Sequence, residues 1–282
     1  MWLVLLIYLL ITLFPFWWVI RTALTTANMV YTDARSLLPV GFTFDNFLRV
    51  LGFLNVDQAV AAGGSGQSIN FFLFLRNSFI FSTIVAIAQT FFSALAAYAF
   101  SRLRFPMRDQ IFLIYIAALM VPPIVTLIPN FILIRQLDLM DSFAGMVLPS
   151  FFMTPFAVFF LRQFFLGVNR EVEEAAKMDG ANIFMVFWRV VLPMTRPPMV
   201  TLGIITFITT WNEYLWPLIV GRAEEVRVLT VALGIFRSQT PQGAPDWAGM
   251  MAGTTLAIIP TVIIFMILGR QVLDSIQFTG FK

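Results

Sequence analysis

The charged residues that could act together lie in one stretch, Glu171–Pro197, which reads EVEEAAKMDGANIFMVFWRVVLPMTRP. It combines seven charged side chains with an apolar run, IFMVFWRVV, at residues 183–191. The chain has no His and no Cys, so it lacks the commonest general base near neutral pH and any thiolate metal ligand. The stretch therefore indicates docking to a partner, and we do not expect an enzyme.

A second chemical candidate is Glu213, which lies in the sequence TTWNEYLWPL inside a predicted membrane span. A carboxylate in a span costs on the order of 2.5–3.5 kcal/mol, so it normally faces the interior of a helix bundle. Aromatic faces beside amide and carboxylate groups suit a sugar, which has apolar C–H faces to stack and hydroxyls to hydrogen-bond. The alternative is an aromatic belt at the outer interface, with Glu213 paired to a neighbouring helix.

Two further polar residues join this candidate substrate path, although hydrogen bonding between helices is the favoured role for both of them and for Gln89. The complete candidate set is Trp211, Asn212, Glu213, Tyr214, Asn77 and Asn130.

The composition is that of an integral membrane protein. The chain has 282 residues, of which 59% are hydrophobic and 12% charged, with a mean hydropathy of +0.86. Soluble globular domains carry about 25% charged residues. The net charge of +3 is spread along the chain, so no basic stripe for nucleic acid is expected.

Six stretches are long and apolar enough to cross a bilayer, which takes about 20 residues in a helix. They do not alternate in the way that strands of a membrane β-barrel do. We therefore predict an all-α integral membrane protein with one transmembrane domain over residues 1–282. The predicted spans are Trp2–Ile20, Phe71–Phe100, Ile111–Leu133, Phe143–Phe165, Met199–Val220 and Met250–Leu268.

The connections between the spans differ in charge and composition. The short segment SRLRFPMRD at 101–109 holds three arginines, and short loops rich in Lys and Arg stay in the cytoplasm. We therefore expect this loop, the loop at 166–198 and both termini to be cytoplasmic. On the other side, AAGGSGQ at 61–67 has the composition of a flexible loop.

Within the loop at 166–198, local signals predict two short helices. Asn169 is a good N-cap, and Gly180 suits the residue that follows a helix in the left-handed conformation. A second helical segment is predicted over Asn182–Val191, apolar nearly all round and ended by Pro193. It must bury its surface against its own bundle, the membrane interface or a partner. An interfacial hairpin without a partner remains an alternative on physical grounds.

The segment EAAKMDGANIFMVFWRVVLP resembles the signature loop of permease subunits of bacterial ABC importers: E-A-A, three residues, Gly, nine residues, then Ile-x-Leu-Pro. Val190 stands in place of the Ile. Almost the whole chain resembles the maltose-type carbohydrate permeases, most of all the MalG-like member of their heterodimers. The stretches that carry this likeness are FPFWWVIRTAL, AYAFSRLRFPMR, MVPPIVTLIPNF, FLRQFF, WNEYLWPLIV and DWAGMMAG.

The resemblance implies that the loop folds as a coupling helix and docks into a groove on a cytoplasmic ATPase subunit. The chain lacks a G-x-x-x-x-G-K-[ST] phosphate loop, so ATP and Mg²⁺ would be bound by that partner and no cofactor by this chain. The expected coupling residues are Glu173, Glu174, Ala175, Ala176, Asp179, Gly180, Ile183, Phe184, Phe187, Leu192 and Pro193.

The implied assembly lies in a bacterial or archaeal inner membrane. It comprises this chain, a MalF-like second permease, two ATPases and an extracytoplasmic sugar-binding protein, surrounded by membrane lipid. The expected substrate is a di- or oligosaccharide, and glycerol 3-phosphate or another polyol is the alternative. A self-sufficient secondary transporter and a membrane scaffold are further alternatives. One intramembrane Glu supports a coupling-ion site poorly.

Overall fold

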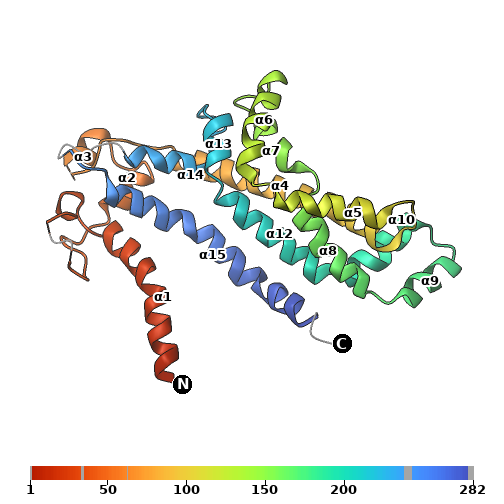
Figure 1. Ribbon diagram of the computed structural model, residues 1–282. Coiled ribbons are helices and arrows are strands. Elements are labelled where there is room, and N and C mark those ends of the chain that lie inside the picture. The colour runs from red at the N-terminus through yellow and green to blue at the C-terminus, as the bar shows by residue number, and fades with distance from the viewer. Residues whose placement is uncertain (1, 33–34, 62, 238–242, 279–282) are drawn as a thin grey trace. The chain divides into compact units, whose positions relative to one another are not determined.

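The computed structural model describes residues 2–32, 35–61, 63–237 and 243–278, with side chains given as far as residue 271 (Figure 1). These residues are helical apart from their connections, and one isolated bridge pairs Thr25 with Phe42. The chain forms two compact units, residues 1–78 with 224–262 and residues 79–223 with 263–282. The all-α class predicted from the sequence is confirmed.

The first unit begins with α1, Trp2–Ala23, whose apolar side chains are almost all exposed. The long helices α4, Phe71–Arg102, and α15, Trp247–Phe278, each contribute their first part to this unit and the rest to the second. The shorter helices of the first unit are η1 (Ala27–Met29), α2 (Asp45–Val50), α3 (Val56–Ala61), α14 (Leu229–Ala232) and η4 (Leu233–Arg237).

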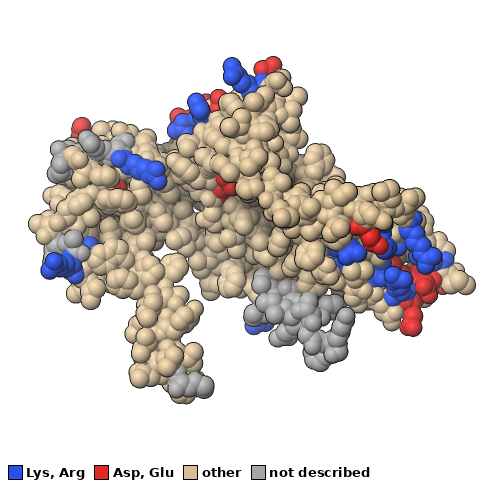
Figure 2. Space-filling model, in the orientation of Figure 1, with Lys and Arg blue, Asp and Glu red and all other residues tan. Residues whose placement is uncertain are grey.

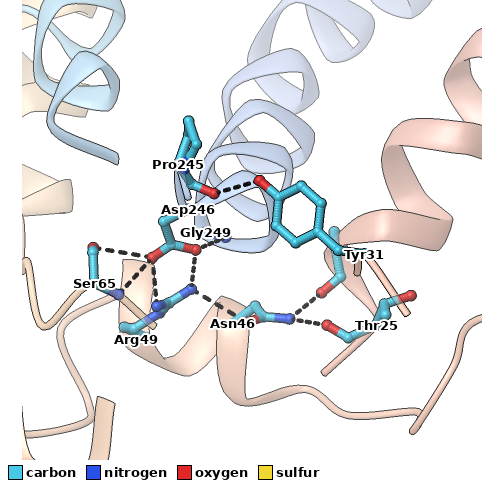
Figure 3. Close-up of polar contacts among 9 residues, drawn as sticks. Thr25, Tyr31, Asn46, Arg49, Ser65, Pro245, Asp246 and Gly249 are labelled. Atoms are coloured by element: carbon cyan, nitrogen blue, oxygen red, sulfur yellow. Dashed lines mark hydrogen bonds and ion pairs between the residues drawn. The ribbon is translucent and has the colours of Figure 1, made fainter. Parts of the chain in front are cut away.

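A buried ion pair holds the first unit together (Figure 3). Arg49 on α2 and Asp246 before α15 approach to 2.6 Å, with side chains 2% and 0% exposed. Asp246 also accepts hydrogen bonds from the backbone and hydroxyl of Ser65, both at 3.1 Å. Ser65, in the Gly-rich segment expected to be flexible, is therefore bonded to this ion pair, and residue 62 of the segment lies outside the described residues. Gly64 has no side chain, and a Cβ there would lie 1.4 Å from a guanidinium nitrogen of Arg49.

The second unit contains the remaining helices. They are α5 (Arg108–Ala117), η2 (Ala118–Met120), α6 (Pro123–Gln136), α7 (Phe143–Phe151), α8 (Pro155–Gly167), α9 (Arg170–Met178), α10 (Ile183–Val186), the π-helical segment η3 (Phe187–Val191), α11 (Leu192–Met194), α12 (Arg196–Trp211) and α13 (Leu215–Val220).

Two of the predicted spans are bent pairs of helices. The axis turns by 97° between residues 108–120 and α6, and by 47° between α7 and α8. Val121 is extended because the residue before a proline is disfavoured in the α region, and Pro123 then begins α6. Thr154 caps α8 by accepting a bond from the backbone of Ala157. Proline and capping signals therefore explain both breaks.

The predicted span at 199–220 also differs from a single helix. α12 begins earlier, at Arg196, and ends at Trp211, and α13 follows a break at 212–214. Three helices in the described residues, α1, α4 and α15, are each long and apolar enough to cross a membrane. The number rises to six if each bent pair counts as one span, and the third pair then joins 183–194 to α12 at 79°.

Candidate functional site

The first helix of the loop at 166–198 forms as the sequence predicts. The side chain of Asn169 accepts a 3.0 Å hydrogen bond from the backbone of Glu171 and so caps α9. Acidic residues occupy the first turn and Lys177 the last, an order that matches the helix dipole. Gly180 follows with φ of +86°, the left-handed conformation expected of it.

The second helical segment runs from α10 to α11 without interruption, so it passes Pro193 and ends at Met194. Asn182 caps it by accepting a 2.8 Å bond from the backbone of Met185. One side, formed by Val186, Phe187 and Val191, is buried in the core of the second unit. Other side chains of the segment are exposed, among them Phe184 at 72%. The apolar run thus packs partly into its own bundle and also leaves large apolar side chains exposed.

Arg102, the last residue of α4, fixes the loop from within. Its guanidinium forms a 2.8 Å ion pair with Glu173 on α9, and the two side chains are 4% and 5% exposed. The same guanidinium donates hydrogen bonds to the carbonyls of Phe165 on α8 and of Val168. One arginine therefore joins the ends of α4 and α8 to α9.

Aromatic contacts add to this attachment. The ring of Phe187 lies 5.1 Å from that of Tyr98, and Trp188 stacks on Phe91 at 5.9 Å. Both partners belong to α4. The second helical segment is therefore packed on the same long helix that holds α9.

The predicted coupling residues divide by exposure. Glu173 and Phe187, both expected as coupling residues, are buried and hold the loop against the bundle, so they do not lie on its surface. Ala176 and Leu192 are partly buried against the same core. The exposed members are Glu174, Ala175, Asp179, Gly180, Ile183, Phe184 and Pro193.

Charged side chains gather around α9, as Figure 2 shows. At this end of the second unit, the apolar side chains of Ile183 and Phe184 are therefore exposed among charged side chains. Among the residues that the structure describes, no three acidic side chains are grouped so as to hold a metal ion.

A cavity of about 680 Å³ lies among the helices of the second unit. Asn130 on α6 and Glu213 in the break between α12 and α13 both line it. The Glu213 carboxylate also accepts a 3.4 Å bond from the backbone of Trp216, whose indole donates to the Met146 carbonyl at 3.0 Å. Glu213 in the helix break and Trp216 at the start of α13 therefore both lie in the wall of the cavity.

The other candidate path residues lie elsewhere. Trp211 is buried and stacks on Phe207, and the amide of Asn212 donates to the Ile208 carbonyl of its own helix. Tyr214, partly buried, does not line the cavity. Asn77 is fully buried in the first unit, where its amide donates to the carbonyls of Glu225 and Arg227. Of the six candidates, the structure brings together Asn130 and Glu213.

Most of the cavity's other polar residues were not singled out by the sequence. Gln89 bonds Thr154 across α4 and α8 at 2.9 Å, the role between helices expected of it. The hydroxyls gave no signal because Ser and Thr are common in membrane helices. The sequence signal that was available for this cavity was the set of prolines at which the nearby helices break. The remaining polar lining residues are Thr126, Ser150, Thr209 and Thr210.

Comparison with known proteins agrees with this arrangement. Residues 89–276 match the family described as binding-protein-dependent transport system inner membrane component. The sn-glycerol-3-phosphate permease protein UgpE of Yersinia pestis is 32% identical over 267 residues, covering 94% of this chain and 91% of UgpE. The arabinooligosaccharide permease protein AraQ of Bacillus subtilis is 32% identical, covering 87% and 84%.

Among solved structures, the fold is similar to that of a bacterial ABC transporter involved in importing the acidic polysaccharide alginate. The TM-score is 0.78 at 25% identity, covering 95% of this chain and 93% of that one. The permeases of this family are not themselves enzymes. With its family match, its relatives and its fold in agreement, the chain belongs to the binding-protein-dependent inner membrane components, the permease subunits of ABC importers.

Proposed function

We propose that this permease forms half of the translocation path of an ATP-driven sugar importer and couples to a cytoplasmic ATPase through the loop at 166–198. The observation that carries the proposal is the loop's division into two surfaces. Its inner side is locked by the buried Arg102–Glu173 pair, while Ile183 and Phe184 are 51% and 72% exposed. Exposed apolar side chains on a rigid support are what a partner groove buries.

In the proposed assembly, two ATPase subunits bind ATP and Mg²⁺, and this chain binds neither. A second permease completes the path, and an extracytoplasmic binding protein delivers the substrate. The arginine-rich loop at 101–109 supports a cytoplasmic location for this end of the second unit, because short Lys/Arg-rich loops remain inside. Both termini then lie in the cytoplasm of a bacterial or archaeal cell.

A neutral di- or oligosaccharide is the substrate class that the 680 Å³ cavity favours. Among the described residues that line it, Glu213 is the one charged side chain, accompanied by hydroxyls, amides and the indole of Trp216. A carboxylate accepts hydrogen bonds from sugar hydroxyls, and an indole face stacks on sugar C–H groups. The relative AraQ, named for arabinooligosaccharides, supports the same class.

Glycerol 3-phosphate is the second candidate because several relatives are named as permeases for it. The cavity's charge argues against a phosphate ester. Its described lining offers Glu213 and no Arg or Lys, and a carboxylate repels a phosphate.

The coupling proposal is tested by Phe184→Ser. The side chain is 72% exposed, so its removal costs little folding energy but removes an apolar contact to the ATPase. We expect the variant to insert normally, to co-purify with less ATPase and to transport more slowly in reconstituted vesicles. Phe53→Ser, at a residue 65% exposed in the first unit, is the matched control. Equal ATPase recovery from the two variants would contradict the proposal.

The substrate class is tested by competition. Uptake of a labelled oligosaccharide into vesicles containing the whole assembly is measured with unlabelled oligosaccharides or glycerol 3-phosphate in excess. We expect only the neutral sugars to compete. Inhibition by glycerol 3-phosphate alone would assign the phosphate ester instead.

A further inference from the structure

Two neighbouring cavities beside the coupling loop are lined by arginines. They measure about 410 and 310 Å³, and Arg104, Arg108 and Arg170 line both. Arg104 lies in the connection between α4 and α5, Arg108 begins α5, and Arg170 begins α9. Arg108 and Arg170 are 62 residues apart in the sequence. The fold therefore brings arginines from distant segments of the chain around one space.

The charges around this space are not balanced within the chain. Arg108 is paired with Asp109 at 3.0 Å, and Arg102 in the smaller cavity is paired with Glu173. Arg104 and Arg170 are exposed and have no carboxylate within ion-pair distance among the described residues. Lys177 and Glu174 also line the smaller cavity and, carrying one charge of each sign, add no net charge to it. Two guanidinium groups remain without an anion, a geometry that suits bidentate binding of phosphate.

An apolar stripe begins at the same place. Met107, which lines the larger cavity, is followed at helical spacing by Ile111 and Ile114 on α5. The three side chains are 64%, 45% and 73% exposed. Because residues four and three apart share a helix face, they form one stripe that leads away from the arginines along an apolar helix. Arginines at one end and apolar side chains along the helix match an amphiphilic ligand that has an anionic head group and a hydrocarbon chain.

We propose that Arg104 and Arg170 bind the phosphate group of an anionic phospholipid, with an acyl chain lying along Met107, Ile111 and Ile114. The site is independent of which substrate the permease carries. An acidic surface of a protein partner would satisfy the arginines equally well. An acidic protein surface would not, however, account for the exposed isoleucines that continue along a helix forming half of a candidate membrane span. The combination of charge and apolar stripe favours the lipid.

The test is native mass spectrometry of the full-length chain in detergent, titrated with phosphatidylglycerol or phosphatidylcholine. We expect selective retention of phosphatidylglycerol. Arg104→Gln and Arg170→Gln should each weaken it roughly fivefold, the gain expected from one basic residue at an anionic membrane surface. Arg196→Gln, at an exposed arginine that begins α12, should leave retention unchanged. Equal retention by the Arg104→Gln/Arg170→Gln double variant and the wild type would overturn the proposal.

Two further arms identify the source of the phosphate. Ile114→Gln should weaken phosphatidylglycerol retention while both arginines stay in place, and inorganic phosphate at millimolar concentration should not displace the lipid. Displacement by phosphate together with no effect of Ile114→Gln would assign a free anion and overturn the lipid site. Loss of ATPase co-purification from the double variant with unchanged lipid retention would assign a protein surface and overturn it as well.

Discussion

Arg102 and Glu173 are buried as an ion pair. Each charge is therefore stabilised by the other. Neutralising one member of a buried pair costs about 3–5 kcal/mol, because it leaves the other charge buried without compensation. We therefore expect Glu173→Gln to loosen α9 from the ends of α4 and α8. Trypsin can report this directly, since Arg170 and Lys177 both lie on α9, and cleavage there should become faster in the variant.

The matched control is the adjacent carboxylate. Glu174 is exposed and has no described ion-pair partner within the chain. Glu174→Gln should therefore leave the rate of tryptic cleavage unchanged. If both variants are cut at the rate of the wild type, the buried pair does not hold the loop.

Glu213 is the residue through which the proposed substrate path can be tested. Glu213→Ala removes an acceptor from the wall of the 680 Å³ cavity, and a hydrogen bond to a charged group contributes about 1.5–3 kcal/mol. We expect half-maximal uptake to require roughly tenfold more substrate, with the complex assembled and its basal ATP hydrolysis intact.

Asn212→Ala is the control for this prediction, because the Asn212 amide bonds its own helix and does not line the cavity. It should transport normally. A normal concentration dependence of uptake in Glu213→Ala would make the carboxylate a feature of helix packing.

At the scale of elements, the sequence predicted what is decided locally. Asn169 and Gly180 mark the two ends of α9 because capping depends on a few neighbouring residues and one backbone angle. Which side of the following segment is buried could not be predicted, since apolar residues occur nearly all round it. Burial of Phe187 and exposure of Phe184 depend on where α4 lies, and that is tertiary information.

The connection at 61–67 shows a second limit of local patterns. Its Gly-rich composition predicts flexibility, but Gly64 is required because the backbone passes against Arg49. The partner Asp246 lies 197 residues away from Arg49. No local pattern links the two, so the contact of this loop with a buried ion pair could not be predicted from its composition.

The close approach at Gly64 leads to a stability prediction for this loop. In Gly64→Ala, the added Cβ would displace the guanidinium of Arg49 from Asp246. We expect the thermal unfolding midpoint of the first unit, followed by tryptophan fluorescence in detergent, to fall by several degrees. Gly167→Ala is the control, since a Cβ there meets nothing within 4 Å. Equal midpoints in the two variants would show that the loop can move aside without cost.

At the scale of the whole molecule, the sequence predicted the helical class and the family but not how the spans are built. Apolar length alone cannot distinguish one straight helix from two helices that meet at 97° or 47°. Which of the path candidates line the cavity could not be predicted for the same reason. Trp211 and Glu213 are two residues apart, yet the end of α12 leaves one buried against Phe207 and turns the other to the cavity.

The topology remains a prediction, and the absence of cysteine makes it directly testable. A cysteine must be placed where it is exposed, which excludes Ser101, buried at 1%, and Ser65, whose hydroxyl bonds Asp246. Asp57 on α3 and Lys177 on α9 are exposed. In sealed cells, Asp57→Cys should react with a membrane-impermeant maleimide and Lys177→Cys should react only after the membrane is opened. Because Arg102 ties the 101–109 loop to α9, labelling of Lys177→Cys from outside would reverse the orientation of both loops and remove the coupling loop from reach of any cytoplasmic ATPase.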